Sequence, residues 1–217
     1  MALDGGIASS ITLYNRVVLP YLLGLTGNIA CGKSTVGRLL AERYGADYVD
    51  ADAVVHTLYA AGAPETAAIA ATFGSDLLRP DGTVDRRLLG DRVLADPNAR
   101  QRLEKLLAPA IGRALTERLD ASAAAVVVLD AIRLIESGLA DRCQAVWVVV
   151  CDSAEQERRL VATRGLTVAQ ARLRIGAQGS QQEKVQRATA VLHNDGDLAA
   201  LERQVAQAWA DSQPQPP

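Results

Sequence analysis

A short apolar segment followed by a glycine-bounded loop constrains the fold of this chain more than any other feature. The apolar segment is YLLGLT, residues 21–26, and apolar side chains recur at helical spacing over residues 36–44. Between them the pattern G-x-x-x-x-G-K-[ST] is matched by Gly27, Asn28, Ile29, Ala30, Cys31, Gly32, Lys33 and Ser34. A strand, a glycine-rich loop and a helix in this order predict a phosphate-binding unit in an α/β fold.

The chemistry of such a loop follows from its backbone. Its N–H groups must point into a concavity that holds a polyphosphate, and glycine permits that path. The dipole at the start of the following helix also favours an anion. Lys33 is predicted to reach the β- and γ-phosphates, and the Ser34 hydroxyl is a predicted ligand of Mg²⁺. We therefore expect residues 27–35, with Thr35 in the first helical turn, to bind ATP.

Further apolar runs alternate with helical patterns along the chain. Strands are predicted at residues 21–26, 48–49, 125–129, 145–150 and 190–193. Helix starts are indicated by Asp96-Pro97 and by three capping boxes, which pair Ser153 with Gln156, Thr167 with Gln170, and Ser180 with Glu183. A last amphipathic helix covers residues 198–209. This alternation predicts a five-stranded parallel sheet with right-handed connections.

The same pattern divides the chain into parts. We expect a flexible leader over residues 1–20, a single domain over 21–211, and a disordered tail from Ser212 to Pro217. Within the domain, the core comprises residues 21–52 and 125–211. Residues 53–124 contain helical patterns and no convincing strand, which predicts an inserted helical lobe. Residues 158–184 are the expected lid.

Composition excludes several classes of function. The net charge is −2, so a general nucleic-acid binder with a basic face is not expected. No apolar stretch is long enough to cross a bilayer, and the N-terminal residues lack the features of a signal peptide. Three cysteines without C-x-x-C spacing argue against a disulfide framework or a zinc site. These features favour a cytoplasmic protein that does not associate with a membrane.

A phosphate loop serves many reactions, and the rest of the chain narrows the choice. No Asn-Lys-x-Asp segment is present to read guanine, and the chain is short for a motor protein. A small kinase with an acceptor lobe and a lid remains. Asp50 and Asp52 end the second predicted strand, where α/β sheets bind ligands. Either aspartate is suited to accept a proton or hold a Mg²⁺-bound water, and Asp52 as a helix N-cap is an equally good interpretation.

At this point a resemblance becomes specific. The run LTGNIACGKSTVGRLL from Leu25, with the segment Tyr48-Val49-Asp50-Ala51-Asp52, resembles the dephospho-CoA kinase family. So do Phe73-Gly74 with residues 82–88, and residues 129–139. The lid and last strand match at Gln156, Arg158, Arg159, Leu160, Arg164, Arg172, Gln178, Lys184, Ala188 and Asn194. The match covers roughly residues 21–205 and implies a three-layer P-loop kinase fold with an acceptor lobe and a lid.

The resemblance implies a role for each matching residue. Asp52 becomes the base or orienting group for the ribose 3′-hydroxyl of dephospho-CoA, and Arg164 approaches the transferring phosphoryl group. Arg86 lies in the acceptor lobe, Asn194 contacts adenine, and Asp130 is a carboxylate for Mg²⁺. Pattern alone also allows Arg164 to be a helix-end residue and Asn194 a turn residue. ATP and Mg²⁺ are the implied cofactors, dephospho-CoA is the acceptor, and no obligatory protein partner is evident.

The chain departs from the family pattern at several positions. Asn28 and Ala30 replace glycines, and we expect Ala30 to fit with a negative φ. Ala108-Pro109 occupies the position where the family pattern has His-Pro, and Ile132-Arg133 the position where it has Pro-Leu. Arg133 is therefore interpreted either as a substrate contact or as a surface charge. Two rival functions stay open: a kinase for a nucleoside or nucleotide, and a nucleotide-binding module whose catalysis has decayed.

Overall fold

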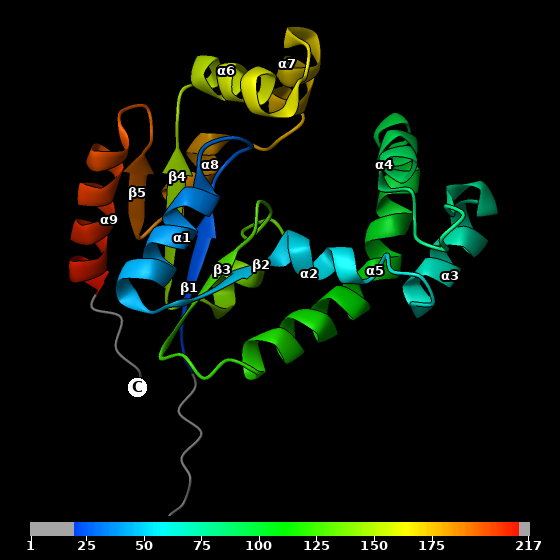
Figure 1. Cartoon of the computed structure of the whole chain (residues 1–217), viewed down its shortest axis with the longest axis horizontal. Coiled ribbons are helices and arrows are strands. Elements are labelled where there is room, and N and C mark those ends of the chain that lie inside the picture. The colour runs from blue at the N-terminus through cyan, green and yellow to red at the C-terminus, as the bar shows by residue number, and fades with distance from the viewer. Residues whose placement is uncertain (1–19, 213–217) are drawn as a thin grey trace, which may run out of the picture.

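Five strands form one parallel sheet at the centre of the molecule (Figure 1). The computed structural model describes residues 20–212, and the expected leader therefore lies outside the described residues except for Pro20. The strands are β1 (Tyr21–Thr26), β2 (Asp47–Asp50), β3 (Val126–Asp130), β4 (Ala145–Val150) and β5 (Ala190–His193). Their order is β2-β3-β1-β4-β5. The predicted five-stranded parallel sheet is confirmed, and the two weak strand predictions, β2 and β5, are both present.

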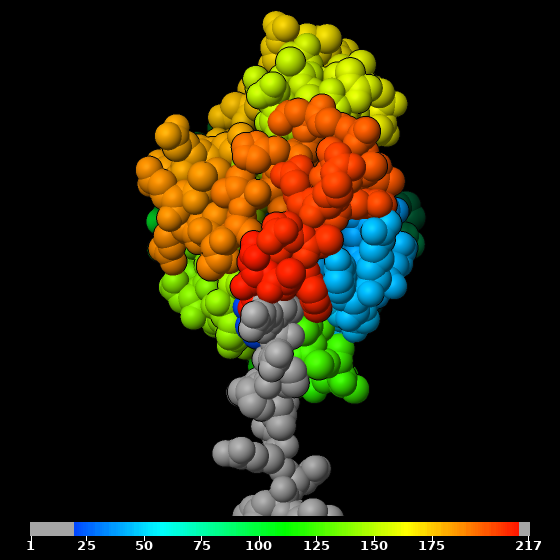
Figure 2. Space-filling view, turned by 90° about the vertical axis from the view of Figure 1, so that its left-hand side faces the viewer, coloured from blue at the N-terminus to red at the C-terminus, as the bar shows by residue number. Residues whose placement is uncertain are grey.

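Helices cover both faces of the sheet, which gives three layers. Helices α1 (Lys33–Tyr44) and α9 (Leu198–Ser212) pack on one face, around the fully buried Trp147. They also contact each other through the stacked rings of Tyr44 and Trp209, and Figure 2 shows them side by side on the surface. The end of α5 (Pro97–Asp120) and α8 (Gln181–Gln186) pack on the opposite face. Strands buried on both faces explain their continuous apolar sequences.

A helical lobe projects from the β2–β3 side of the sheet (Figure 1). It contains α2 (Ala51–Thr57), α3 (Pro64–Phe73), α4 (Arg86–Ala95) and most of α5, with the short 3-10 helix Ser75–Leu77. These elements enclose a separate apolar cluster that includes Ile69, Leu77 and Leu107. As expected, Asp96 accepts from the backbone N–H of Asn98 and Pro97 is the first residue of α5. The lobe therefore has its own small core beside the sheet.

Helices α6 (Ser153–Arg164) and α7 (Val168–Gly176) lie above the carboxyl end of the sheet (Figure 1). The predicted capping box of Thr167 with Gln170 is confirmed. The other two are wrong. Ser153 lies inside α6 because Asp152 takes the N-cap position, and the Ser180 side chain makes no cap hydrogen bond. The Gln156 side chain is buried and donates to the Ile29 carbonyl, so it is not available as the partner of Ser153 in the predicted capping box.

The end of the chain also corrects one expectation. Ser212 belongs to α9, and its hydroxyl accepts a hydrogen bond from the Trp147 indole, so the expected tail does not begin there. Residues 213–217 lie outside the described part. A second 3-10 helix, Leu139–Arg142, precedes β4. Among residues 20–212, no helix has both the length and the apolar sequence needed to cross a membrane.

Candidate active site

The loop between β1 and α1 has the backbone conformation of a phosphate-binding loop. Gly27 has φ 147°, and a Cβ there would overlap the Val149 carbonyl. Ala30 has φ 60°, which corrects our expectation of a negative value. The loop needs a left-handed turn at a position where the family pattern has glycine, and alanine tolerates it at a cost of roughly 1–2 kcal/mol. Ala30 is the one non-glycine residue with positive φ in the described range 20–212.

Three consecutive carbonyls of the loop are bound by side chains outside it. Gln156 donates to the Ile29 carbonyl at 3.0 Å and Arg159 to the Ala30 carbonyl at 3.1 Å, both from α6. The Asn194 amide, just after β5, donates to the Cys31 carbonyl at 2.7 Å. Arg159 also donates to the Asn194 carbonyl at 2.8 Å. With its carbonyls held from outside, the loop keeps a shape in which N–H groups can line the concave side.

The segment between α7 and α8 also contacts the loop. The Gln178 side chain accepts from the Ile29 N–H at 2.6 Å, and Asn28 donates to the Gly179 carbonyl at 3.4 Å. Lys184 is buried and donates to Glu136 at 2.8 Å and to the Ile132 carbonyl at 2.6 Å. The base of the expected lid is therefore docked on the loop, whereas Arg164, at the end of α6, is exposed.

Lys33 and three carboxylates gather at the same edge of the sheet. Asp50 ends β2 and lies opposite Asp130 in register, and Asp52 follows in α2. Burial raises the pKa of Asp130, and the charges of Asp50 and Asp52 raise it further, whereas the nearby Lys33 ammonium lowers it. Asp50 and Asp130 are neighbours across the β2–β3 pairing, and Lys33 and Asp52 lie in the first turns of α1 and α2, at the same edge of the sheet. Lys33 is partly exposed in the first turn of α1, and the adjacent Ser34 is exposed.

Tyr48 holds the buried carboxylate of Asp130. Its hydroxyl donates to Oδ2 of Asp130 at 2.7 Å, and burial together with this contact raises the pKa of Tyr48 well above its ordinary value. The ring lies against Gly37 of α1, where any Cβ would overlap it. Asp130 thus has one carboxylate oxygen fixed by the protein.

The structure separates the roles of Asp50 and Asp52. Oδ1 of Asp50 accepts from the backbone N–H groups of Asp52 and Ala53, at 2.9 and 3.2 Å. Asp50 is therefore the N-cap of α2, and the interpretation of Asp52 as the N-cap is wrong. The helix begins at Ala51, two residues earlier than that interpretation requires. Asp52 lies in the first turn with an exposed side chain.

The oxygen groups at this edge fit a magnesium ion. Mg²⁺ prefers oxygen ligands and often uses one or two protein groups, with waters and substrate phosphates completing its shell. The Ser34 hydroxyl and the Asp130 carboxylate match that requirement. Among residues 20–212, no group of three or more His, Cys, Asp or Glu side chains is placed to hold a metal ion.

A cleft of about 760 Å³ opens between the lobe, the loop after β3 and the lid base. Ile29 of the phosphate loop lines it, and so do Arg86 and Arg133, the two predicted acceptor contacts. Lys33, Asp52 and Arg164 are not among its lining residues. Tyr59, which does line it, has its pKa raised by burial, with Arg86 and Asp52 acting on it in opposite senses. His56, one turn after Asp52 on α2, also lines the cleft, so Asp52 lies near its edge.

Several residues in this arrangement were not assigned a role from the sequence. Tyr48, Gln156, Arg159 and Gln178 shape the loop and the carboxylate cluster through contacts that span more than 80 residues of sequence. All four residues belong to the segments that resemble the family, but the resemblance gave their positions without their contacts. Cys31, within the loop, is fully buried, and its Sγ accepts a hydrogen bond from the Gln156 amide at 3.0 Å. Hydrogen bonding from the Cys151 side chain lowers the pKa of Cys31.

Comparison with known proteins agrees with this geometry. The family model described as dephospho-CoA kinase matches residues 21–200. The chain is 43% identical to a dephospho-CoA kinase of Geobacter sulfurreducens over 193 residues, covering 87% of this chain and 97% of the relative. A Streptomyces avermitilis relative of the same name is also 43% identical, over 190 residues, covering 87% of this chain and 92% of the relative.

Solved structures show the same fold. A Thermus thermophilus protein called TT1252 superposes with a TM-score of 0.77 at 34% identity, over 88% of this chain and 97% of that one. A shikimate kinase from Acinetobacter baumannii, at 17% identity and a TM-score of 0.53, shares the fold alone, over 90% of this chain and 96% of that one. The extent of the family match and the identity to its members show that the chain belongs to the dephospho-CoA kinase family.

Proposed function

We propose that the protein transfers the γ-phosphoryl group of ATP to the ribose 3′-hydroxyl of dephospho-CoA, giving coenzyme A and ADP. One observation carries this function beyond the family relationship. The phosphate loop leads into Lys33, the paired strands β2 and β3 end at Asp50 and Asp130, and Asp52 follows in the first turn of α2. These groups share the carboxyl edge of the sheet, beside a cleft lined with arginine. A donor site, an acceptor site and a candidate base therefore adjoin one another.

The donor side rests on residues 27–35. Lys33 and the loop N–H groups other than those of Ile29 and Cys31, which are bonded within the protein, surround the ATP phosphates. Lys33 stabilises charge on the β- and γ-phosphates during transfer. Ser34 and Asp130 hold Mg²⁺. When bound, the ion neutralises charge on the phosphate oxygens. Asn194, whose amide nitrogen donates to the loop, lies at the end of β5, where we place the adenine.

Asp52 is the proposed base. The acceptor oxygen attacks the γ-phosphorus as its proton passes to the Asp52 carboxylate, and the bond to the ADP leaving oxygen breaks. Because Asp50 caps α2, Asp52 is not required for the helix start and stays exposed at the edge of the cleft. The proposal requires the acceptor hydroxyl to bind within hydrogen-bond reach of this carboxylate.

Arg164 is the proposed lid group. It is exposed at the end of α6, and closure of the outer lid is needed to bring its guanidinium to the transferring phosphoryl group. A planar guanidinium there stabilises charge on the equatorial oxygens. Arg86 and Arg133, on opposite sides of the cleft, are the proposed contacts of the acceptor. We further propose the cytoplasm as the compartment, since Cys31, Cys143 and Cys151 are free thiols.

ADP production with dephospho-CoA, compared with a panel of nucleosides and nucleotides, tests this function. We expect turnover with dephospho-CoA to exceed every panel member by orders of magnitude. Turnover with a panel member and none with dephospho-CoA selects a different small-molecule kinase. Tight ATP binding without turnover of any acceptor selects a nucleotide-binding module.

A further inference from the structure

The cleft beside the phosphate loop is strongly cationic, although the whole chain is slightly acidic. Only Asp91 and Glu136 are acidic among the side chains that line it. Six basic side chains line the same space: Arg86, Arg87, Arg100, Arg133, Arg174 and Lys184. An excess of four positive charges in one cleft favours a ligand with several negative charges.

One basic group of the cleft is already neutralised. Lys184 is buried and its ammonium is bonded to Glu136 and to the Ile132 carbonyl. It joins the lid base to the segment after β3 and has a structural partner for its charge. The arginines, at the open part of the cleft, are therefore the groups to consider for an anionic ligand.

Two of these arginines are held together by a single carboxylate. Oε1 of Glu104 accepts from Nε of Arg100 at 3.1 Å and also from Nη1 of Arg133. Arg100 and Glu104 are one turn apart on α5, whereas Arg133 follows β3 in the core. The hydrogen bonds with Arg133 lower the pKa of Glu104, so the carboxylate stays ionised. This Arg100–Glu104–Arg133 unit connects the lobe with the core.

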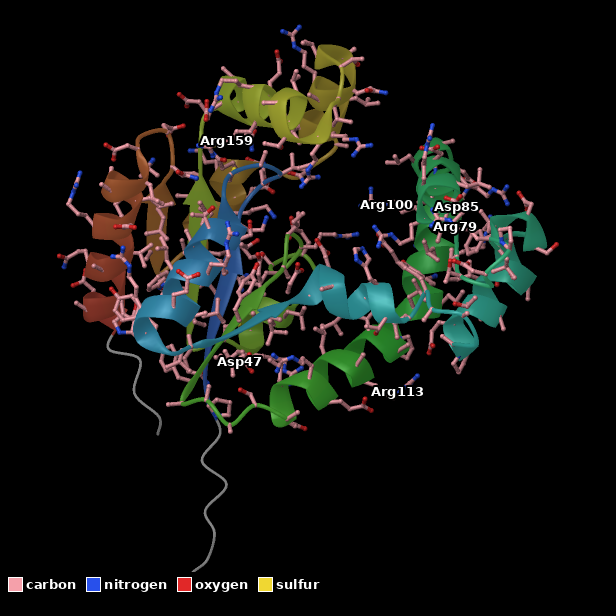
Figure 3. All side chains as sticks on the ribbon, in the orientation of Figure 1. Asp47, Arg79, Asp85, Arg100, Arg113 and Arg159 are labelled. Atoms are coloured by element: carbon pink, nitrogen blue, oxygen red, sulfur yellow. The ribbon has the colours of Figure 1, made fainter. Side chains whose placement is uncertain are left out.

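The unit presents its cations to the cleft and its anion away from it. Arg100 and Arg133 line the cleft, and Glu104 does not. Figure 3 shows Arg100 on the side of the lobe that faces the sheet. Each guanidinium has five N–H donors, and Glu104 engages one nitrogen of each arginine. The remaining donors form two neighbouring planar forks, the geometry that binds phosphate oxygens in pairs.

We propose that the Arg100–Glu104–Arg133 unit is a subsite for the 5′-diphosphate of the acceptor, with Glu104 as the residue that positions both arginines. This inference rests on the proposed function, because dephospho-CoA carries a diphosphate on the ribose whose 3′-hydroxyl reacts. The family pattern has leucine at the position of Arg133, so the unit gives this chain an additional hold on the diphosphate. The ATP phosphates have their own loop, of which only Ile29 lines the cleft.

The test compares Arg133→Leu, which restores the family residue, with wild type. We expect the KM for dephospho-CoA to rise roughly tenfold to a hundredfold, because charge-assisted hydrogen bonds are lost. The KM for ATP, kcat and the inhibition constant of adenosine, which lacks a diphosphate, should change less than threefold. Titration calorimetry with dephospho-CoA should show the same loss in affinity without turnover.

Further variants separate position from charge. Glu104→Gln should raise the KM for dephospho-CoA severalfold with kcat retained, since the arginines lose their fixed arrangement. Arg113→Ala is the matched control, because Arg113 lies on the same helix, forms an exposed ion pair with Glu65 and does not line the cleft (Figure 3). It should behave as wild type in every assay.

Each other outcome overturns a defined statement. An unchanged KM for dephospho-CoA in Arg133→Leu, with wild-type turnover normal, overturns the subsite alone. If inhibition by adenosine weakens as much as binding of dephospho-CoA, Arg133 acts on the nucleoside or on the lobe. If the KM for ATP rises, Arg133 belongs to the ATP site. Either result contradicts the proposal. Absence of wild-type turnover with dephospho-CoA overturns the proposed function, and the subsite falls with it.

Discussion

Oδ1 of Asp50 accepts a 2.9 Å hydrogen bond from the backbone N–H of Asp52. The two aspartates of one short segment are thereby given different tasks. Asp50 satisfies the start of α2, and its carboxylate is committed to the backbone. Asp52 is held in the first turn with an exposed side chain, which makes it available to a substrate.

This difference predicts an effect on stability. Asp50→Ala removes the cap of α2, and we expect a loss of about 1 kcal/mol in the free energy of unfolding. For a domain of this size the melting temperature should fall by roughly 2–4 °C. Asp50→Asn caps about as well as aspartate and should melt within about 1 °C of wild type. Equal melting of Asp50→Ala and wild type contradicts the capping role.

Lys33→Ala tests the phosphate loop. Without the Lys33 ammonium, the negative charge on the β- and γ-phosphates is no longer stabilised during transfer, so we expect kcat to fall by at least about a hundredfold. The circular dichroism spectrum should not change, because the Lys33 side chain is not part of the core. Lys105→Ala, at an exposed lysine of α5, is the control and should keep the wild-type rate. A kcat close to wild type in Lys33→Ala rules out the assigned role.

The ion pair between β2 and α5 predicts a dependence of stability on pH. Arg118 donates to both carboxylate oxygens of Asp47, at 2.8 and 2.7 Å, and this bonding lowers the pKa of Asp47 below 3.8. A lowered pKa in the folded state stabilises the fold above the unfolded-state pKa, and that stability is lost as pH falls through the folded-state pKa. Solvent screens this partly exposed pair, so the contribution is about 1 kcal/mol.

Urea unfolding of wild type and Asp47→Asn from pH 7 to pH 3 measures this contribution. The other carboxyls titrate in both proteins, so their effects cancel in the difference between the two free energies of unfolding. That difference should be constant down to about pH 4 and shrink below it, as Asp47 itself becomes protonated. If the difference in the free energy of unfolding grows as the pH falls, the effect has the opposite sign and contradicts a stabilising ion pair between Asp47 and Arg118.

The lid offers a prediction about motion. Its base is docked through Gln178 and Lys184, whereas the end of α6 at Arg164 is exposed. Hydrogen exchange over residues 158–184 should therefore slow on binding a non-hydrolysable ATP analogue, with the larger change around Arg164. The buried strand β4 should exchange equally slowly in both states. Identical exchange over the lid with and without the analogue contradicts closure over ATP.

Local patterns in the sequence predicted the sheet well. Tyr21–Thr26, Ala145–Val150 and Ala190–His193 are apolar runs with strand length, and all three are strands as predicted. Capping predictions were less successful: Asp152 takes the N-cap position predicted for Ser153, and Ser180 is the N-cap of α8 but its side chain makes no cap hydrogen bond. The φ of Ala30 was predicted wrongly since the loop path, and not the residue's preference, sets it.

The contacts that organise the site could not be predicted from pattern. The loop carbonyls are bound by Gln156, Arg159 and Asn194, which are 125 or more residues away along the chain. Glu104 joins Arg100 and Arg133 only after the lobe packs beside the sheet. The sequence locates such residues on elements, and the fold decides which side chains meet.

The rate of phosphoryl transfer to dephospho-CoA by Asp52→Asn, set against wild type, is the most direct measurement of the proposed chemistry. Asparagine keeps the shape of the side chain and removes its basicity. We predict an unchanged affinity for ATP, a melting temperature within a few degrees, and a kcat lower by roughly 10²–10⁴. A stable Asp52→Asn that transfers phosphate at close to the wild-type rate contradicts the role of Asp52 as the base.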